Sequence, residues 1–266
     1  MKRIVLREAG LTLTCLLPES GNEKCVPEER GIQDGWADSG AADFRPGLIW
    51  FHGAQDGLCL PEELLEAANT ACVCISGEDW NRDLTPWPAE RIFKSGEDFG
   101  GKADAYLALL AETIIPRTEE ALSVKPRFRA LAGVSLAGLF SVYAAYRTDL
   151  FDRIASISGS LWYDDFLAFM RAHKPSARLE RAYFSLGDRE KKTGNRRMAR
   201  VEEGTLEAVR LLREELGDVG GERAGRKQAG RKQAGEERVF FETNPGNHFA
   251  DPEGRMERAF RWLLRD

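Results

Sequence analysis

The spacing of hydrophobic residues changes at one place in this chain, and the change predicts a strand, a tight turn and a helix. Residues 128–132 form a short, mostly apolar run between Pro126 and Gly133, which is typical of a buried strand. From Leu136 onward, apolar side chains recur at helical intervals. Ser135 therefore stands at the apex of a strand, turn and helix.

Further apolar runs extend this pattern along most of the chain. We predict strands at 2–7, 11–17, 47–51, 71–75, 153–158, 181–187 and 238–242, and helices at 61–68, 103–115 and 204–216 and from Asp251 onward. The first two strands are expected to form an antiparallel edge, and Pro116 is expected to bend or end the second helix. The continuous apolar runs favour an α/β fold with a mostly parallel central sheet and helices on both of its faces.

Two segments lack this periodicity. Residues 19–45 are polar and rich in Gly, Pro, Asp and Glu, and we predict a long surface loop there. Residues 217–237 repeat Ala-Gly-Arg-Lys-Gln and contain no run of large apolar side chains, which predicts a disordered insertion. The total of 266 residues suits a single domain, 1–266, that contains both segments.

Composition excludes several classes of protein. The formal net charge is -5, and charges of both signs are mixed along the chain, so no nucleic-acid surface is expected. The apolar run after Met1-Lys-Arg has only Ile, Val and Leu, too few for a signal peptide or a membrane span. The five cysteines form no C-x-x-C pair, which favours reduced thiols in a cytoplasmic protein. No cluster has metal-ligand spacing, so we expect neither metal nor cofactor, and the oligomeric state stays open.

The segment Gly133-Val-Ser-Leu-Ala137 has the form of a nucleophile elbow. Such a turn raises the serine hydroxyl above the sheet and points the next backbone N–H, that of Leu136, at a developing oxyanion. The motif G-x-S-x-G ends here in Ala137, which Gly138 follows. The alternative is a chance match in a chain with 26 glycines.

The strand at 47–51 ends in His52-Gly53-Ala54, upstream of the elbow. This is where such enzymes place the second oxyanion-hole amide, and we predict the N–H of Ala54 for it. An ordinary glycine between strand and loop is the alternative. We expect His52 itself to be structural.

The chain order of a hydrolase triad is serine, acid, histidine. His248 follows the last predicted strand and precedes the last helix, which favours it as the catalytic base. Glu190, three residues after Gly187, is the predicted acid, and Asp188 is the reserve. The alternative is that both carboxylates only solvate a turn.

Loops at the carboxyl ends of parallel strands form the ligand crevice of such a sheet. On this basis Trp80, Arg82, Trp87 and Trp162 are candidates for substrate binding, with Arg82 available to a carboxylate or phenolate. The alternative is that these tryptophans anchor a surface loop or cover the core.

Five motifs together resemble the putative-esterase group of the α/β-hydrolase superfamily, which includes siderophore trilactone esterases and esterase D-like enzymes. They are residues 79–83, 133–139, 158–162, 185–190 and 246–249. The resemblance implies an α/β-hydrolase fold with Ser135 as nucleophile and His248 as base. It leaves open an acid or a serine–histidine dyad.

The expected function is hydrolysis of a small-molecule carboxylic ester through an acyl-enzyme intermediate. An acyltransferase or thioesterase would use the same triad on another acceptor or leaving group. A member without catalytic activity would instead bind a small molecule, such as an iron chelate, in the same pocket.

Overall fold

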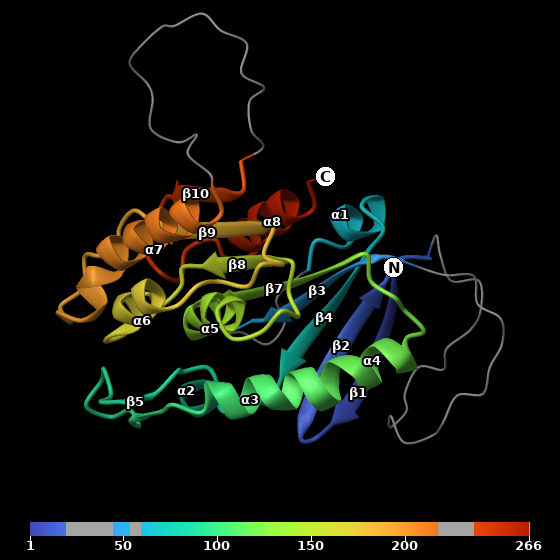
Figure 1. Ribbon diagram of the computed structural model, residues 1–266, viewed down its shortest axis with the longest axis horizontal. Helices are drawn as coiled ribbons and strands as arrows, with labels where there is room; N and C mark the ends of the chain where they lie inside the picture. The colour runs from blue at the N-terminus through green and yellow to red at the C-terminus, as the bar shows by residue number, and fades with distance from the viewer. Residues whose placement is uncertain (20–44, 54–59, 218–236, 266) are drawn as a thin grey trace, which may run out of the picture.

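The computed structural model describes residues 1–19, 45–53, 60–217 and 237–265 (Figure 1). The predicted surface loop at 19–45 and the predicted insertion at 217–237 lie almost entirely outside these ranges, as does Ala54.

One eight-stranded sheet forms the centre of the protein, in the order β1-β2-β4-β3-β7-β8-β9-β10. Its strands are β1 (Lys2–Glu8), β2 (Leu11–Leu17), β3 (Gly47–His52), β4 (Thr70–Ser76), β7 (Phe128–Val134), β8 (Arg153–Ile157), β9 (Arg181–Gly187) and β10 (Val239–Asn244). The pairs β1·β2 and β2·β4 are antiparallel, and all other neighbours are parallel. The mostly parallel sheet with an antiparallel N-terminal edge is thus confirmed.

Helices cover both faces of this sheet (Figure 1). One face carries α3 (Ala103–Leu109), α4 (Ile115–Ala121), α5 (Leu136–Ala145), α6 (Phe166–Ala172) and α7 (Val201–Glu215), and the other carries α1 (Glu62–Ala67) and α8 (Pro252–Leu263). Strand β3 shows why both faces are covered: Trp50 belongs to the first core cluster and Phe51 to the second. Neighbouring strand residues point to opposite faces, so an uninterrupted apolar strand needs cover on each side.

The prediction for Pro116 was wrong about where the helix ends. The helix continues to Ala121 through a π-helical turn at Leu110–Ile114, directly before α4. Proline has no N–H to donate and its ring crowds the carbonyl four residues earlier. A wider turn ahead of Pro116 fits that restriction, so the chain remains helical.

Three elements near the carboxyl ends of the strands were not predicted. They are α2 (Trp80–Asp83), the two-stranded sheet of β5 (Pro88–Ala89) and β6 (Phe99–Gly100), and α6. Helix α2 and the strands β5 and β6 have at most four residues each, too few to establish a clear period in the sequence. Within the described ranges, every helix is too short or too polar to span a bilayer.

Candidate active site

Ser135 sits between β7 and α5 in the backbone conformation φ 58°, ψ -120°. Such a positive φ costs on the order of 1–3 kcal/mol for a residue other than glycine, so the surroundings must hold it in place. The Ser135 N–H donates to the carbonyl of Ile157 at 3.1 Å, and the Ser135 carbonyl accepts from Leu139 at 3.1 Å and Ser160 at 2.9 Å. Strand β8 and the loop after it therefore fix the elbow.

Gly133 lets the strand and the helix of the elbow meet. A Cβ at this position would lie 2.5 Å from both the carbonyl carbon and the Cβ of Ala137. Real Cβ atoms do not approach that closely, so the missing side chain of Gly133 makes room for the methyl group of Ala137. This explains how alanine fits where the elbow motif usually has its last glycine.

We expect Gly133→Ala to lower the free energy of unfolding by about 1–3 kcal/mol, because it overpacks the elbow. Gly194→Ala is the matched control, since a Cβ there meets nothing within 4 Å. Urea unfolding of the two variants beside the wild type measures the difference. Equal stability of both variants would contradict the packing described for the elbow.

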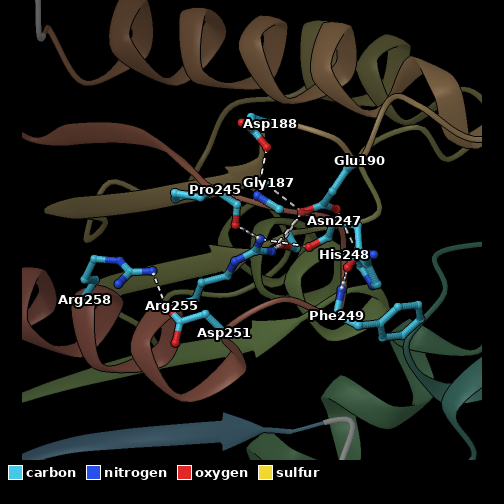
Figure 2. A network of polar contacts seen from close by, with 12 residues as sticks. Gly187, Asp188, Glu190, Pro245, Asn247, His248, Phe249, Asp251, Arg255 and Arg258 are labelled. Atoms are coloured by element: carbon cyan, nitrogen blue, oxygen red, sulfur yellow. Dashed lines mark hydrogen bonds and ion pairs between the residues drawn. The ribbon is translucent and has the colours of Figure 1, made fainter.

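Glu190 and His248 approach each other because their loops leave the sheet side by side. Strands β9 and β10 are parallel neighbours, with Gly187 in register with Asn244 at their carboxyl ends. Glu190 follows β9, His248 follows β10, and Nδ1 of His248 lies 2.8 Å from Oε2 of Glu190 (Figure 2).

The reserve acid, Asp188, has a different contact. Its Oδ1 accepts from the backbone N–H of Gly246 at 2.8 Å, and the side chain is exposed (Figure 2). Asp188 therefore braces the loop that carries His248, whereas Glu190 contacts the imidazole itself.

The other carboxylate oxygen of Glu190 is fully engaged. Oε1 accepts from Ser158 Oγ at 2.7 Å, from the Gly187 N–H at 2.7 Å and from Arg255 Nη1 at 3.1 Å. Only Oε2 is therefore left for His248. Burial alone would raise the pKa of Glu190, but the hydrogen bonds from His248, Ser158 and Gly187 outweigh burial and hold the pKa below its usual value. The carboxylate is consequently ionised at neutral pH.

The guanidinium of Arg255 connects the loops that follow β8, β9 and β10. The sequence prediction missed this residue. It lies in α8 with 1% of its surface exposed, and its Nη1 donates to Ser158 Oγ at 2.8 Å. Its Nη2 donates to the carbonyls of Pro245 at 3.3 Å and Asn247 at 2.9 Å (Figure 2). One sequence feature could have identified Arg255: it is a charged residue four positions before Ala259, on the apolar stripe of the last helix.

We expect Arg255→Met to lower the free energy of unfolding by about 3–5 kcal/mol, because it leaves the buried carboxylate of Glu190 without its cation. Arg261→Met is the control, because it removes a cation from the same helix at an exposed ion pair: the side chains of Arg261 and Glu257 are 61% and 48% exposed. It should lower the free energy of unfolding by less than about 1 kcal/mol. Chemical denaturation compares the two variants. A loss at position 255 no larger than that at 261 would show that the buried contacts contribute little.

Ser135, Glu190 and His248 line one cavity of about 370 Å³. The Ser135 Oγ lies 3.4 Å from the Oγ of Ser160, which also lines the cavity. Leu136 lines it as well, at the first position of α5, where the N–H has no partner inside the helix. The other predicted oxyanion amide, that of Ala54, lies outside the described residues.

The predicted substrate-binding residues divide into two groups. Trp80 and Trp162 line the cavity, whereas Arg82 and Trp87 do not. Arg82 pairs with Asp83, Nε to Oδ1 at 2.8 Å, and faces a separate, more polar cavity. Residues two apart on a helix point in different directions, which separates Trp80 from Arg82 within α2.

Trp87 is half-buried and packs against the core instead. Its indole N–H donates to the carbonyl of Asp164 at 3.1 Å, and its ring packs against Tyr163, Phe166 and Phe169. The cavity residues that the sequence prediction missed are Asn81, Arg91, Ile92, Phe93, Gly96, Glu97, Phe99, Ser158, Ser160, Met198, Val201 and Phe249. Of these, Phe249 could have been found, because it directly follows His248.

His52 is fully buried and does not line the cavity. Its Nε2 hydrogen-bonds to the hydroxyl of Tyr106 at 2.9 Å, and burial lowers the pKa of His52 to about 3. The imidazole is therefore neutral at physiological pH and packs between Tyr106 and Phe140.

This burial predicts a pH dependence of stability. Between pH 6.5 and about 3 the unfolded chain binds a proton on His52 that the folded chain does not, so stability falls as pH falls through this window. At pH 5 the loss attributable to His52 should be on the order of 2 kcal/mol relative to pH 7.5. The measurement is the stability of the wild type minus that of His52→Gln at both pH values, with the exposed His173→Gln as control. A pH-independent difference would contradict a neutral, buried His52.

Comparison with known proteins assigns this chain to a protein family. The sequence model of the family described as "Putative esterase" matches residues 45–218, more than half of the chain. The protein belongs to this family. This family member is 33% identical over 179 residues to the uncharacterized protein YbbA of Bacillus subtilis (strain 168), covering 62% of this chain and 70% of that protein.

Two solved structures share the fold of this family member. An IroE-like serine hydrolase from Shewanella oneidensis superposes with a TM-score of 0.67 at 14% identity, covering 99% of this chain and 79% of the other. The siderophore hydrolase EstB from Aspergillus nidulans gives a TM-score of 0.59 at 20% identity, covering 98% and 94%. The α/β-hydrolase fold that the resemblance implied is thus confirmed.

Proposed function

We propose that this protein hydrolyses a small-molecule carboxylic ester through an acyl-enzyme intermediate on Ser135. The observation that carries the proposal is the contact of 2.8 Å between the buried carboxylate of Glu190 and Nδ1 of His248, on the same cavity as the strained serine. Membership in the putative-esterase family supports the same reaction. A cytoplasmic location, suggested by the cysteine pattern, is part of the proposal.

Each residue of the proposed triad has a defined task. With Nδ1–H donating to Glu190, the Nε2 of His248 keeps its lone pair and can accept the proton of Ser135 Oγ. The oxygen attacks the ester carbonyl carbon, the bond to the alcohol breaks, and His248 returns the proton to the leaving alcohol. Water then attacks the acyl-enzyme with His248 again as base, which releases the acid and regenerates Ser135.

The negative charge on the carbonyl oxygen needs donors that are already in place. The N–H of Leu136 at the start of α5 supplies one, and we propose the N–H of Ala54 as the second. One donor of this kind contributes roughly 3 kcal/mol to the transition state.

A fluorophosphonate probe tests this function. Mass spectrometry of the folded protein should find one adduct, on the peptide that contains Ser135, and none in the Ser135→Ala variant. Turnover of p-nitrophenyl esters against acyl-thioesters then separates an esterase from a thioesterase, and an added alcohol acceptor reveals acyl transfer. If the probe leaves the folded wild type unmodified, the protein is a binding member of the family.

A further inference from the structure

The mouth of the active-site cavity exposes hydrophobic surface. Three large hydrophobic side chains of the described residues are exposed: Phe93 (63%), Leu206 (47%) and Phe249 (74%). Two of them, Phe93 and Phe249, line the cavity, from two different loops. Single exposed hydrophobic residues are common on protein surfaces, but two phenyl rings at one cavity mouth indicate a surface that a ligand covers.

The wall behind this mouth is also apolar. It is formed largely by Trp80, Ile92, Phe99, Trp162 and Met198. Among the polar lining residues, the Oγ of Ser160 lies 3.4 Å from that of Ser135, and Ser158 donates to Glu190, which contacts His248. Apolar walls with a few convergent polar groups are typical of a small-molecule site that recognises shape at one end and reacts at the other.

Of the cavity-lining residues that the structure describes, Arg91 is the one arginine, and it is already paired with Asp98. Arg91 is exposed, but its Nε and its backbone N–H donate to Asp98 Oδ1 at 3.0 and 3.1 Å, and its Nη1 donates to the Gly96 carbonyl at 3.1 Å. Glu190 is engaged with His248 and Arg255, and Glu97 adds a negative charge at the mouth. The balance of charge among the described lining residues therefore favours an uncharged ligand over a carboxylate or a phenolate.

The loop that carries Phe93 is held in place by hydrogen bonds from side chains of another segment. The Ile92 carbonyl accepts from Asn195 Nδ2 at 3.2 Å, and the Glu90 carbonyl accepts from Arg197 Nη1 at 2.6 Å. Arg197 also pairs with Asp164 at 2.7 Å, and its guanidinium lies 5.7 Å from the ring centroid of Trp162. An apolar wall held by such contacts favours a rigid, flat group, because neither partner loses much conformational freedom on binding.

We propose that the substrate is an ester with an uncharged aromatic group, which lies against the apolar wall and against Phe93 and Phe249. This inference rests on the proposed ester hydrolysis at Ser135. Aromatic rings contact one another edge-to-face or offset, and two phenyl rings at the mouth offer such contacts to a ligand ring.

The experiment is a set of esters compared by kcat/KM after correction for their rates of alkaline hydrolysis. p-Nitrophenyl 2-naphthoate and 2-naphthyl acetate carry an uncharged aromatic group on the acyl or the alcohol side, p-nitrophenyl acetate lacks the extra ring, and mono-p-nitrophenyl terephthalate adds a carboxylate. We expect one of the naphthyl esters to exceed the acetate by about tenfold or more, and the terephthalate to fall below the naphthoate.

Variants of the two exposed phenylalanines test whether these side chains cause the preference for naphthyl esters. Phe93→Ala and Phe249→Ala should lower kcat/KM for the preferred naphthyl ester about fivefold more than for p-nitrophenyl acetate. Leu206→Ala, which removes an exposed hydrophobic residue away from the cavity, should leave the ratio unchanged. A preference for the acetate or the terephthalate, or equal losses on all esters in the two phenylalanine variants, would overturn the inference.

A binding measurement separates this inference from the reaction itself. In Ser135→Ala, 2-naphthyl acetate should quench the fluorescence of Trp80 and Trp162, which line the cavity. Adding Phe93→Ala should weaken the Kd about fivefold, and adding Leu206→Ala should not. If the fluorophosphonate labels Ser135 but naphthyl esters neither bind nor react preferentially, the aromatic substrate is wrong and the hydrolase stands. If they bind as described without labelling or turnover, the hydrolase is wrong and the aromatic ligand stands.

Discussion

Replacing Ser135 with alanine is expected to lower kcat/KM for ester hydrolysis by a factor on the order of 10⁴ or more. Without the hydroxyl no acyl-enzyme forms, and only the oxyanion donors and substrate binding remain to accelerate the attack of water. The measurement is turnover of p-nitrophenyl acetate, with circular dichroism to establish that the variant is folded.

Ser141→Ala is the matched control for this variant. Ser141 lies in α5, the helix that directly follows Ser135, is fully buried and donates to the carbonyl of Ala137 at 2.9 Å, away from the cavity. We expect it to retain most of the activity. Full activity of Ser135→Ala would rule out the proposed mechanism, whatever the control shows.

The second large effect is expected from Glu190→Gln, which should lower kcat by a factor of roughly 10³–10⁴. Glutamine is nearly the same size, but its amide can donate to Nδ1 of His248. This contact favours the tautomer that carries its proton on Nε2, where the proton of Ser135 has to be accepted. The variant also removes the negative charge that would stabilise the imidazolium formed during attack.

Asp188→Asn is the matched control for the acid. Asp188 contacts the backbone N–H of Gly246 and not the imidazole, so its variant should keep activity within about threefold of the wild type. Steady-state kinetics of the two variants decide between three arrangements. Loss only in Asp188→Asn would make Asp188 the acid, and full activity in both would mean that Ser135 and His248 act as a dyad.

Local sequence pattern was sufficient for most of the fold. The continuous apolar run of β3 predicted a strand covered on both faces, and the change of period at Ser135 predicted the elbow. These features depend on residues close together in the chain, because the side-chain period and the small size of Gly133 act over a few positions. Pattern alone failed for α2 and the β5–β6 pair, which are too short to show a period.

The site needed information that local pattern does not contain. Glu190 and His248 are 58 positions apart, and they meet because the sheet order makes β9 and β10 neighbours with their ends in register. A sequence with the same apolar runs says nothing about which strands are adjacent.

The sequence by itself determined which segments become strands and helices and which serine occupies the turn, since backbone sterics and side-chain periodicity are local. Only the tertiary structure decided that Arg255 is buried beneath the acid, that Trp80 faces the cavity while Arg82 does not, and that Phe93 and Phe249 share one mouth. The reason is that these positions depend on how each helix and loop is rotated against the sheet. That rotation is set by packing among residues distant in the chain.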